Sequence, residues 1–282
     1  MVLFGPSGND ELFYEQGYKS SKEVFKWLNE MGLDLYEYSF GRGILLKDET
    51  AIEYAKLAKE NNILISVHAP YFINLANPDS ESINKSYDYI DNSLRKLILM
   101  DGKKCVVHIG SCMKMAREDA IKNVTYNLQK YMENFDANFG DKGVFVCPET
   151  MGKYQQIGTY KEIVDLCTLH EKLIPTLDFG HINCILQGKL DLAEYRKILD
   201  YMFEKLGDEK AKMVHIHFSK IEFSDKGEVR HLTLEDTKYG PNFEPLADLL
   251  KEYKMHNATI ISESKNIMAQ DAKKLKAIFY SN

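Results

Sequence analysis

Histidines and acidic residues recur along this chain where short β-rich runs end. Each run is a candidate strand, and the ionisable residue lies at its end or just beyond it. Imidazole nitrogens mixed with carboxylate oxygens suit zinc, manganese or iron better than magnesium, which prefers an all-oxygen shell. We therefore expect a divalent metal centre if these runs end at one place in the fold. The residues concerned are His68, His108, Glu149, Asp178, His181, His217 and Glu263.

The elements that must position these residues alternate between strand and helix. Between the runs, apolar residues fall at helical spacing, as with Ala51, Tyr54, Ala55 and Ala58. This alternation predicts parallel strands joined by crossover helices. The early glycines in FGPSGN (4–9) do not form the G-x-G-x-x-G loop typical of a doubly wound sheet. The expected strands cover 2–4, 33–40, 63–69, 104–109, 143–149, 173–179, 213–219 and 258–264.

Eight such strands with their helices predict an α/β fold, a single (β/α)8 TIM barrel that forms one domain over residues 1–282. The length agrees, because barrels of this kind commonly run to about 250 residues. In a parallel barrel the C-terminal ends of the strands meet at one rim, and the loops there are free to vary. The histidines and carboxylates above would meet at that rim.

The number of candidate ligands bears on the number of metal ions. Burying so many ionisable groups together would carry a heavy desolvation cost without cations. A zinc ion takes about four ligands, so the set implies at least two ions, with Glu149 placed to bridge a pair. Two metal ions a few ångströms apart favour in-line displacement at phosphorus, where one generates hydroxide and the other holds the leaving oxygen. We therefore expect phosphoester hydrolysis, with Glu149 as the catalytic residue beside the attacking hydroxide.

The overall composition sets the class of protein. The first ten residues lack the charged start and apolar run of a signal peptide, and no apolar stretch approaches the ~20 residues that span a bilayer. We expect a cytoplasmic monomer without a membrane partner.

Five cysteines without ligand spacing predict buried thiols, not a disulfide framework or a zinc finger. The formal charge of -6 gives no global attraction to nucleic acid and leaves room for a local basic patch.

Six segments resemble, in order and spacing, the signature segments of the endonuclease IV family of apurinic/apyrimidinic endonucleases. They are VHAPYFINLANP (67–78), VVHIGS (106–111), PET (148–150), LDFGHI (177–182), HIHFSK (215–220) and SES (262–264). The most specific are the His-x-x-Tyr-x-Ile-Asn-Leu stretch from His68 and the pair of Asp178 and His181. The resemblance implies a TIM barrel with a trinuclear zinc cluster. It also implies hydrolysis of double-stranded DNA on the 5′ side of an abasic site, a step of base excision repair.

The same resemblance distributes the metal ligands over three zinc sites. It selects His217 over His215, which we expect to be an interior histidine of the barrel. The sequence departs from the family at the third site, where the aspartate two residues before His231 is replaced by Val229. Either Glu228 substitutes for it or the third ion is held weakly, so we expect two or three zinc ions, with manganese or iron also suited. The first site takes His68 and His108, the second takes Asp178, His217 and Glu263, the third takes His181 and His231, and Glu149 bridges the first two.

Two further residues are candidates for handling DNA. Enzymes that act on a damaged nucleotide usually extrude it from the base stack, and an inserted side chain can hold the gap open. Tyr71 matches the tyrosine that the family inserts into DNA. Arg42, in the FGRG loop after the second expected strand, is the candidate for a partner wedge.

Two other classes of function remain open. The same barrel superfamily includes metal-dependent sugar isomerases and epimerases, and a fold alone does not decide function. Their sites are richer in carboxylates and need fewer ions, so the histidines count against them, while the missing aspartate and the acidic charge count for them. A metal-bound but inactive nucleic-acid-binding protein is the third class, and an intact Glu149 disfavours it.

Overall fold

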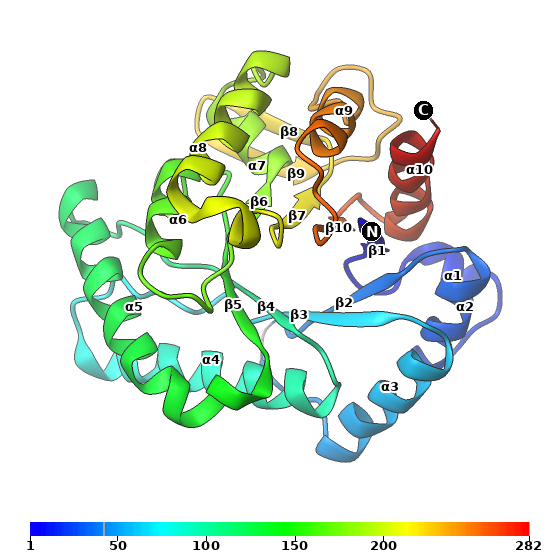
Figure 1. The fold of residues 1–282 in the computed structure, drawn as a ribbon, viewed down its shortest axis with the longest axis horizontal. Coiled ribbons are helices and arrows are strands. Elements are labelled where there is room, and N and C mark those ends of the chain that lie inside the picture. Colours follow the sequence, from blue (N-terminus) through cyan, green and yellow to red (C-terminus); the bar gives the residue numbers. More distant parts are fainter. Residues whose placement is uncertain (42, 282) are drawn as a thin grey trace.

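The computed structural model describes residues 1–41 and 43–281. Eight parallel strands form a ring, and the helices lie around its outside (Figure 1). The strands are ordered β1-β10-β7-β6 and β2-β3-β4-β5, and isolated bridges join β1 to β2 and β5 to β6. This is the predicted barrel. Its strands are β1 (Leu3–Pro6), β2 (Leu35–Ser39), β3 (Leu64–His68), β4 (Lys104–Val107), β5 (Phe145–Pro148), β6 (Thr176–Asp178), β7 (His215–Phe218) and β10 (Thr259–Ser262).

The helices follow from local signals as well as from packing. A capping box of Thr159 and Glu162 starts α6, and the predicted apolar stripe of Ala51, Tyr54 and Ala58 is buried in α3. The helices are α1 (Glu11–Glu15), α2 (Val24–Glu30), α3 (Asp48–Glu60), α4 (Ser80–Leu99), α5 (Arg117–Phe139), α6 (Tyr160–Cys167), α7 (Phe179–Ile185), α8 (Leu192–Ala211), α9 (Glu244–Glu252) and α10 (Met268–Tyr280), with short 3₁₀ turns η1 (Ser21–Glu23) and η2 (Gly140–Lys142).

One element was not expected from the sequence. The segment after β7, which lies outside the expected strands, is an antiparallel hairpin of β8 (Ile221–Ser224) and β9 (Gly227–His231). Gly227, with φ of +100°, occupies the turn side of β9, a backbone conformation that favours glycine. The hairpin places His231 and Glu228 near His181 at the barrel rim. The pairing of β8 with β9 fixes their positions, which an irregular loop would not do.

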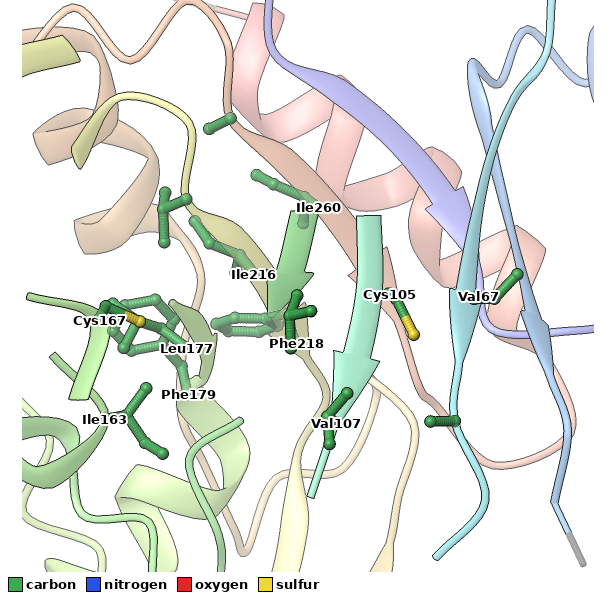
Figure 2. Close-up of a cluster of buried hydrophobic side chains, with 14 of the residues drawn as sticks. Val67, Cys105, Val107, Ile163, Cys167, Leu177, Phe179, Ile216, Phe218 and Ile260 are labelled. Carbon is green, nitrogen blue, oxygen red and sulfur yellow. The ribbon is translucent and has the colours of Figure 1, made fainter. Parts of the chain in front are cut away.

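Alternation along the strands separates the barrel interior from the helix-facing layer. Figure 2 shows Ile216 and Phe218 of β7 packed in the same apolar cluster as Leu177, Phe179 and Ile163. Successive side chains of a strand point to opposite faces, so His215 and His217, which alternate with Ile216 and Phe218 in β7, point into the barrel. Both are fully buried. The interior of this barrel is therefore polar where β7 crosses it.

The remaining expectations about the core concern thiols and membranes. All five cysteines are buried free thiols, as predicted. Among residues 1–41 and 43–281, no helix combines the length and the apolar character needed to cross a membrane.

Candidate metal centre

The strand ends bring the predicted ligands together at one pocket of about 380 Å³, which all of them line except the fully buried Asp178 and His217. His68 ends β3 and Asp178 ends β6, while His108, Glu149 and Glu263 lie one residue beyond β4, β5 and β10. Their ligand atoms form three groups, and the atoms of each group lie within 4.8 Å of one another. The groups are His68, His108 and Glu149; Glu149, Asp178, His217 and Glu263; and His181, Glu228 and His231. A fourth group within the same limit, Glu37, His215 and His217, includes two residues that are not among the predicted ligands.

The first group places two imidazole nitrogens against one carboxylate oxygen. His68 Nδ1 lies 2.8 Å from the carbonyl oxygen of Ala69. A carbonyl only accepts, so Nδ1 carries the hydrogen and Nε2 keeps its lone pair. That Nε2 lies 3.2 Å from Glu149 Oε2, and His108 Nε2 lies 3.0 Å from the same oxygen. The three atoms form a donor set of the kind that zinc prefers.

The second group gathers three carboxylates around His217. Its Nδ1 lies 2.7 Å from Glu149 Oε1 and 3.5 Å from Glu263 Oε2. Asp178 Oδ1 accepts a hydrogen bond of 2.8 Å from the backbone N–H of His181, which caps α7. Asp178 Oδ2 is buried without a hydrogen-bond partner among the described residues. The oxygen lies 3.2 Å from His181 Nδ1, which instead donates to the carbonyl oxygen of Thr150. A buried carboxylate oxygen without a hydrogen bond in such a cluster fits a cation ligand.

The charges of this cluster also fit bound cations. Burial raises the pKa of Asp178 to about 6, and the Glu263 and Glu149 carboxylates add to that rise while His181 opposes it. Burial alone would lower the pKa of His181, but the surrounding carboxylates, Asp178 foremost, raise it to about 9. Protonation is thus one way for the cluster to relieve its negative charge. Divalent cations at the same positions would relieve it more completely.

The third group joins α7 to the hairpin. His181 Nδ1 donates to the carbonyl oxygen of Thr150 at 2.9 Å, which leaves Nε2 as its free nitrogen, 3.5 Å from Glu228 Oε2. His231 Nε2 lies 3.8 Å from Glu228 Oε1. Each histidine thus turns its Nε2 toward the Glu228 carboxylate. The structure therefore brings Glu228 into the position left open by the sequence.

A β-bulge explains why Glu228 and not residue 229 faces this group. Glu222 pairs with Arg230 but the next residue, Phe223, pairs with Glu228, so Val229 is an extra residue in β9. In a regular strand, residues three apart point to opposite faces. The extra residue cancels that offset and turns Glu228 to the face of His231. Val229 itself is 54% exposed.

Gly152 is required where β9 crosses the loop after β5. A Cβ atom at this position would lie 2.8 Å from His181 Cδ2 and 2.9 Å from Glu228 Cβ. Both contacts are shorter than side chains tolerate, so a larger residue would push the third group apart. The close backbone approach of glycine makes this group possible.

If each of the three groups holds one zinc ion, as the resemblance implies, replacing Glu228 with alanine should remove one ion per chain and leave the others in place. Adding Val229→Asp to that variant should not restore the ion, because the side chain at 229 faces solvent. Elemental analysis of the zinc-loaded, gel-filtered proteins measures this, and Glu222→Ala on the same hairpin is the matched control. Recovery of the ion in the double variant would show that the bulge does not exist in solution.

Of the two residues expected to handle DNA, Tyr71 lies at the pocket and Arg42 is not described by the structure. Tyr71 is 53% exposed at the pocket edge, and its ring centroid lies 5.6 Å from that of His68 and 5.4 Å from that of His108. It thus overhangs the first group from the rim. Lys153 also lines the pocket. Arg42 lies outside the described residues.

Glu37 in β2 is a neighbour of the metal centre that the sequence did not reveal. Its carboxylate is fully buried, with Oε1 3.0 Å from His217 Nε2 and Oε2 2.9 Å from His215 Nε2. Burial would raise the pKa of Glu37, but the two histidines, His217 first, hold it well below its usual range. The available signal was a carboxylate in the middle of the strand-like run LDLYEYSF, which also contains Asp34. His215 is an interior histidine, as expected.

The barrel and its rim of metal-ligand groups agree with one family. The family described as xylose isomerase-like TIM barrel matches residues 25–278, and this chain belongs to it. An uncharacterized protein of Methanocaldococcus jannaschii is 32% identical, with 94% of this chain and 92% of that protein covered. A protein of Malacoplasma penetrans named probable endonuclease 4 is 28% identical over 77% of this chain and 75% of its own length. The resemblance to the endonuclease IV family is thereby confirmed.

Solved structures show the same fold with more than one activity. Endonuclease IV from Thermus thermophilus has a TM-score of 0.67 at 18% identity, covering 92% of this chain and 93% of that one. A D-tagatose 3-epimerase-like protein has a TM-score of 0.68 at 20% identity, covering 88% of each chain. At such identities the likeness establishes the fold, and the activity has to be argued from the site.

Proposed function

We propose that this protein is a zinc-dependent endodeoxyribonuclease that cleaves double-stranded DNA on the 5′ side of abasic sites. The observation that carries the proposal is the set of three ligand groups around one pocket, two of which share Glu149. A shared carboxylate is the arrangement needed to hold two cations a few ångströms apart. The relatives named probable endonuclease 4 support the same substrate class.

Three zinc ions per chain fit the residues present, and manganese or iron also suits this mixture of nitrogen and oxygen ligands. His68, His108 and Glu149 would hold the first ion. The second and third would lie in the Asp178 and Glu228 groups. When bound, the cations would supply the Lewis acidity that activates water and stabilises the departing 3′ oxygen.

The chain's own groups then position the reactants. Glu149 holds the first two groups together and is placed to accept a hydrogen bond from the attacking water. In the net reaction a water oxygen forms a bond to phosphorus, the bond from phosphorus to the 3′ oxygen breaks, and that oxygen takes up a proton. Lys153 at the pocket wall is placed to contact a phosphate. Tyr71 is placed to fill the gap left by the missing base.

A sugar isomerase or epimerase is the second candidate function, and one feature favours it. The group of Glu149, Asp178, His217 and Glu263 is carboxylate-rich and is sufficient to hold one ion. A one-ion reaction on a sugar, however, would leave the other two groups without a role. The nuclease interpretation uses all three groups.

Strand cleavage and sugar isomerisation can be tested side by side. The zinc-loaded protein is incubated with an end-labelled duplex containing one abasic site, with the same duplex lacking it, and with a panel of ketoses. We expect a single nick 5′ to the abasic site and unchanged ketoses. Isomerised ketoses with an intact duplex would contradict the proposal and support the second candidate.

Replacing Tyr71 with alanine should weaken binding of the abasic duplex by roughly tenfold, since stacking on one aromatic side chain contributes about 1–3 kcal/mol. The zinc content should stay unchanged, because Tyr71 offers no ligand atom to the three groups. Fluorescence anisotropy with a chelated, inactive protein reports the affinity. Tyr126→Ala, an exposed tyrosine on α5 away from the pocket, is the matched control. Equal losses in both variants would remove Tyr71 from the DNA surface.

A further inference from the structure

A chain of buried polar side chains runs through the barrel interior from the start of β4 to the metal centre. Barrel interiors are ordinarily filled by branched apolar residues, and a buried polar chain carries a desolvation penalty. Three of its members, Glu37, His215 and His217, have ligand atoms within 4.8 Å of one another, and only His217 also belongs to one of the three predicted ligand groups. Its members, in order, are Lys104, Thr259, His215, Glu37 and His217, all buried.

The first links of this chain have a fixed direction. Lys104 Nζ lies 2.6 Å from the carbonyl oxygen of Met213 and 2.7 Å from Thr259 Oγ1. An ammonium group only donates, so the threonine oxygen accepts from it. Thr259 Oγ1 lies 2.6 Å from His215 Nδ1. The threonine oxygen has two acceptor sites, so the direction of this link is decided by the other side of His215.

The remaining links lead to Glu37 and His217. His215 Nε2 lies 2.9 Å from Glu37 Oε2, and a carboxylate only accepts, so Nε2 holds the hydrogen and donates. The neutral ring then leaves Nδ1 to accept the hydrogen of Thr259. Ser66 Oγ donates to the same oxygen at 2.8 Å. Glu37 Oε1 lies 3.0 Å from His217 Nε2, and a carboxylate only accepts. Neither of these two buried atoms makes a hydrogen bond among the described residues, and His217 Nδ1 also faces a carboxylate oxygen, Glu149 Oε1 at 2.7 Å. A cation held on the Nδ1 side by Glu149, Asp178 and Glu263 would leave Nε2 as the nitrogen that carries the hydrogen, on the side of Glu37.

We propose that Glu37 is a positioning residue that fixes the tautomer and orientation of His217 for the second cation. Its Oε1 lies 3.0 Å from His217 Nε2 and would accept Nε2–H when a cation occupies the Nδ1 side, while the Lys104-to-His215 chain holds the other carboxylate oxygen. Outer carboxylates of this kind raise the basicity of a metal-bound imidazole and set its direction. The inference rests on the proposed metal centre and is independent of the substrate.

Glu37→Gln tests the inference, because an amide can accept from one histidine but must turn its N–H₂ toward the other. We expect the affinity for the second zinc ion, the one that His217 would bind, to fall by roughly 10- to 100-fold. Competition with a chelator measures this affinity. Nitrogen-15 NMR of the zinc-loaded protein should show His217 with Nε2–H in the wild type and a mixed tautomer in the variant. Unchanged affinity together with an unchanged His217 tautomer would overturn the proposal.

Two further variants keep the test independent of folding. Ser66→Ala removes one hydrogen bond to Glu37 but keeps both histidine contacts, so zinc affinity should stay at the wild-type level. Lys104 is the member of the polar chain farthest from His217, and Lys104→Met frees Thr259 to accept or donate. This variant should therefore lower affinity for the same ion by less than Glu37→Gln does. A Lys104→Met protein with wild-type zinc affinity and His217 tautomer would overturn the directed chain even if Glu37→Gln fails to fold.

The outcome is separable from the proposed nuclease activity. A wild-type protein that binds zinc but leaves abasic DNA intact would contradict the nuclease and leave the Glu37 test valid. A wild-type protein that binds no zinc would overturn both.

Discussion

Replacing Glu149 with glutamine should reduce cleavage of an abasic duplex by about 10³-fold, within the range seen when one group that acts on the reacting atoms is removed. The amide keeps the size of the side chain but loses its charge. Glu149 Oε2 faces two imidazole nitrogens, and Oε1 lies 2.7 Å from His217 Nδ1, so one substitution weakens two groups at once. Single-turnover assays with saturating zinc measure the loss.

The control for this variant is Glu133→Gln, which changes an exposed carboxylate on α5. It should leave cleavage unchanged. Circular dichroism and the melting temperature of each metal-free protein report whether folding is intact. A Glu149→Gln protein that binds its full set of ions and cleaves at the wild-type rate would show that Glu149 takes no part in the reaction.

Removing the metal should destabilise the folded protein as well as inactivate it. Without cations, the buried carboxylates of Glu149 and Asp178 lie beside the partly buried carboxylate of Glu263, and their negative charges repel. A ligand that binds only the native state stabilises it by about 4 kcal/mol at a concentration 1,000 times its dissociation constant. For a chain of this size we expect each tightly held ion to raise the melting temperature by roughly 10 °C.

Differential scanning calorimetry before and after chelation, followed by zinc addition, measures this shift. The Glu149→Gln variant should show a smaller shift, because it loses part of two ligand groups. A melting temperature that does not respond to chelation or to added zinc would contradict a buried multi-ion centre.

Much of the fold and site follows from local sequence patterns. Alternating strand-like and helix-like runs predict the barrel, since a parallel strand needs a crossover helix before the next. The rim position of His68, His108 and Glu149 follows from their place at the ends of such runs. These features depend on one segment at a time, and so they can be read from one sequence.

The features that the sequence did not predict depend on two segments at once. The bulge at Val229 exists only in the pairing of β8 with β9, so the resemblance alone left Glu228 undecided. Glu37 contacts His215, which lies 178 residues later in the sequence. Strand propensity gives no information about so distant a partner. A buried carboxylate becomes interpretable only when the groups that compensate its charge are located.

The most direct measurement is the number of zinc ions bound per chain, determined by elemental analysis after zinc loading and gel filtration. The three ligand groups predict three ions in the wild type and two in Glu228→Ala. One ion or none in the wild type, or equal zinc contents in the two proteins, would contradict the three-site centre on which the proposed DNA cleavage depends.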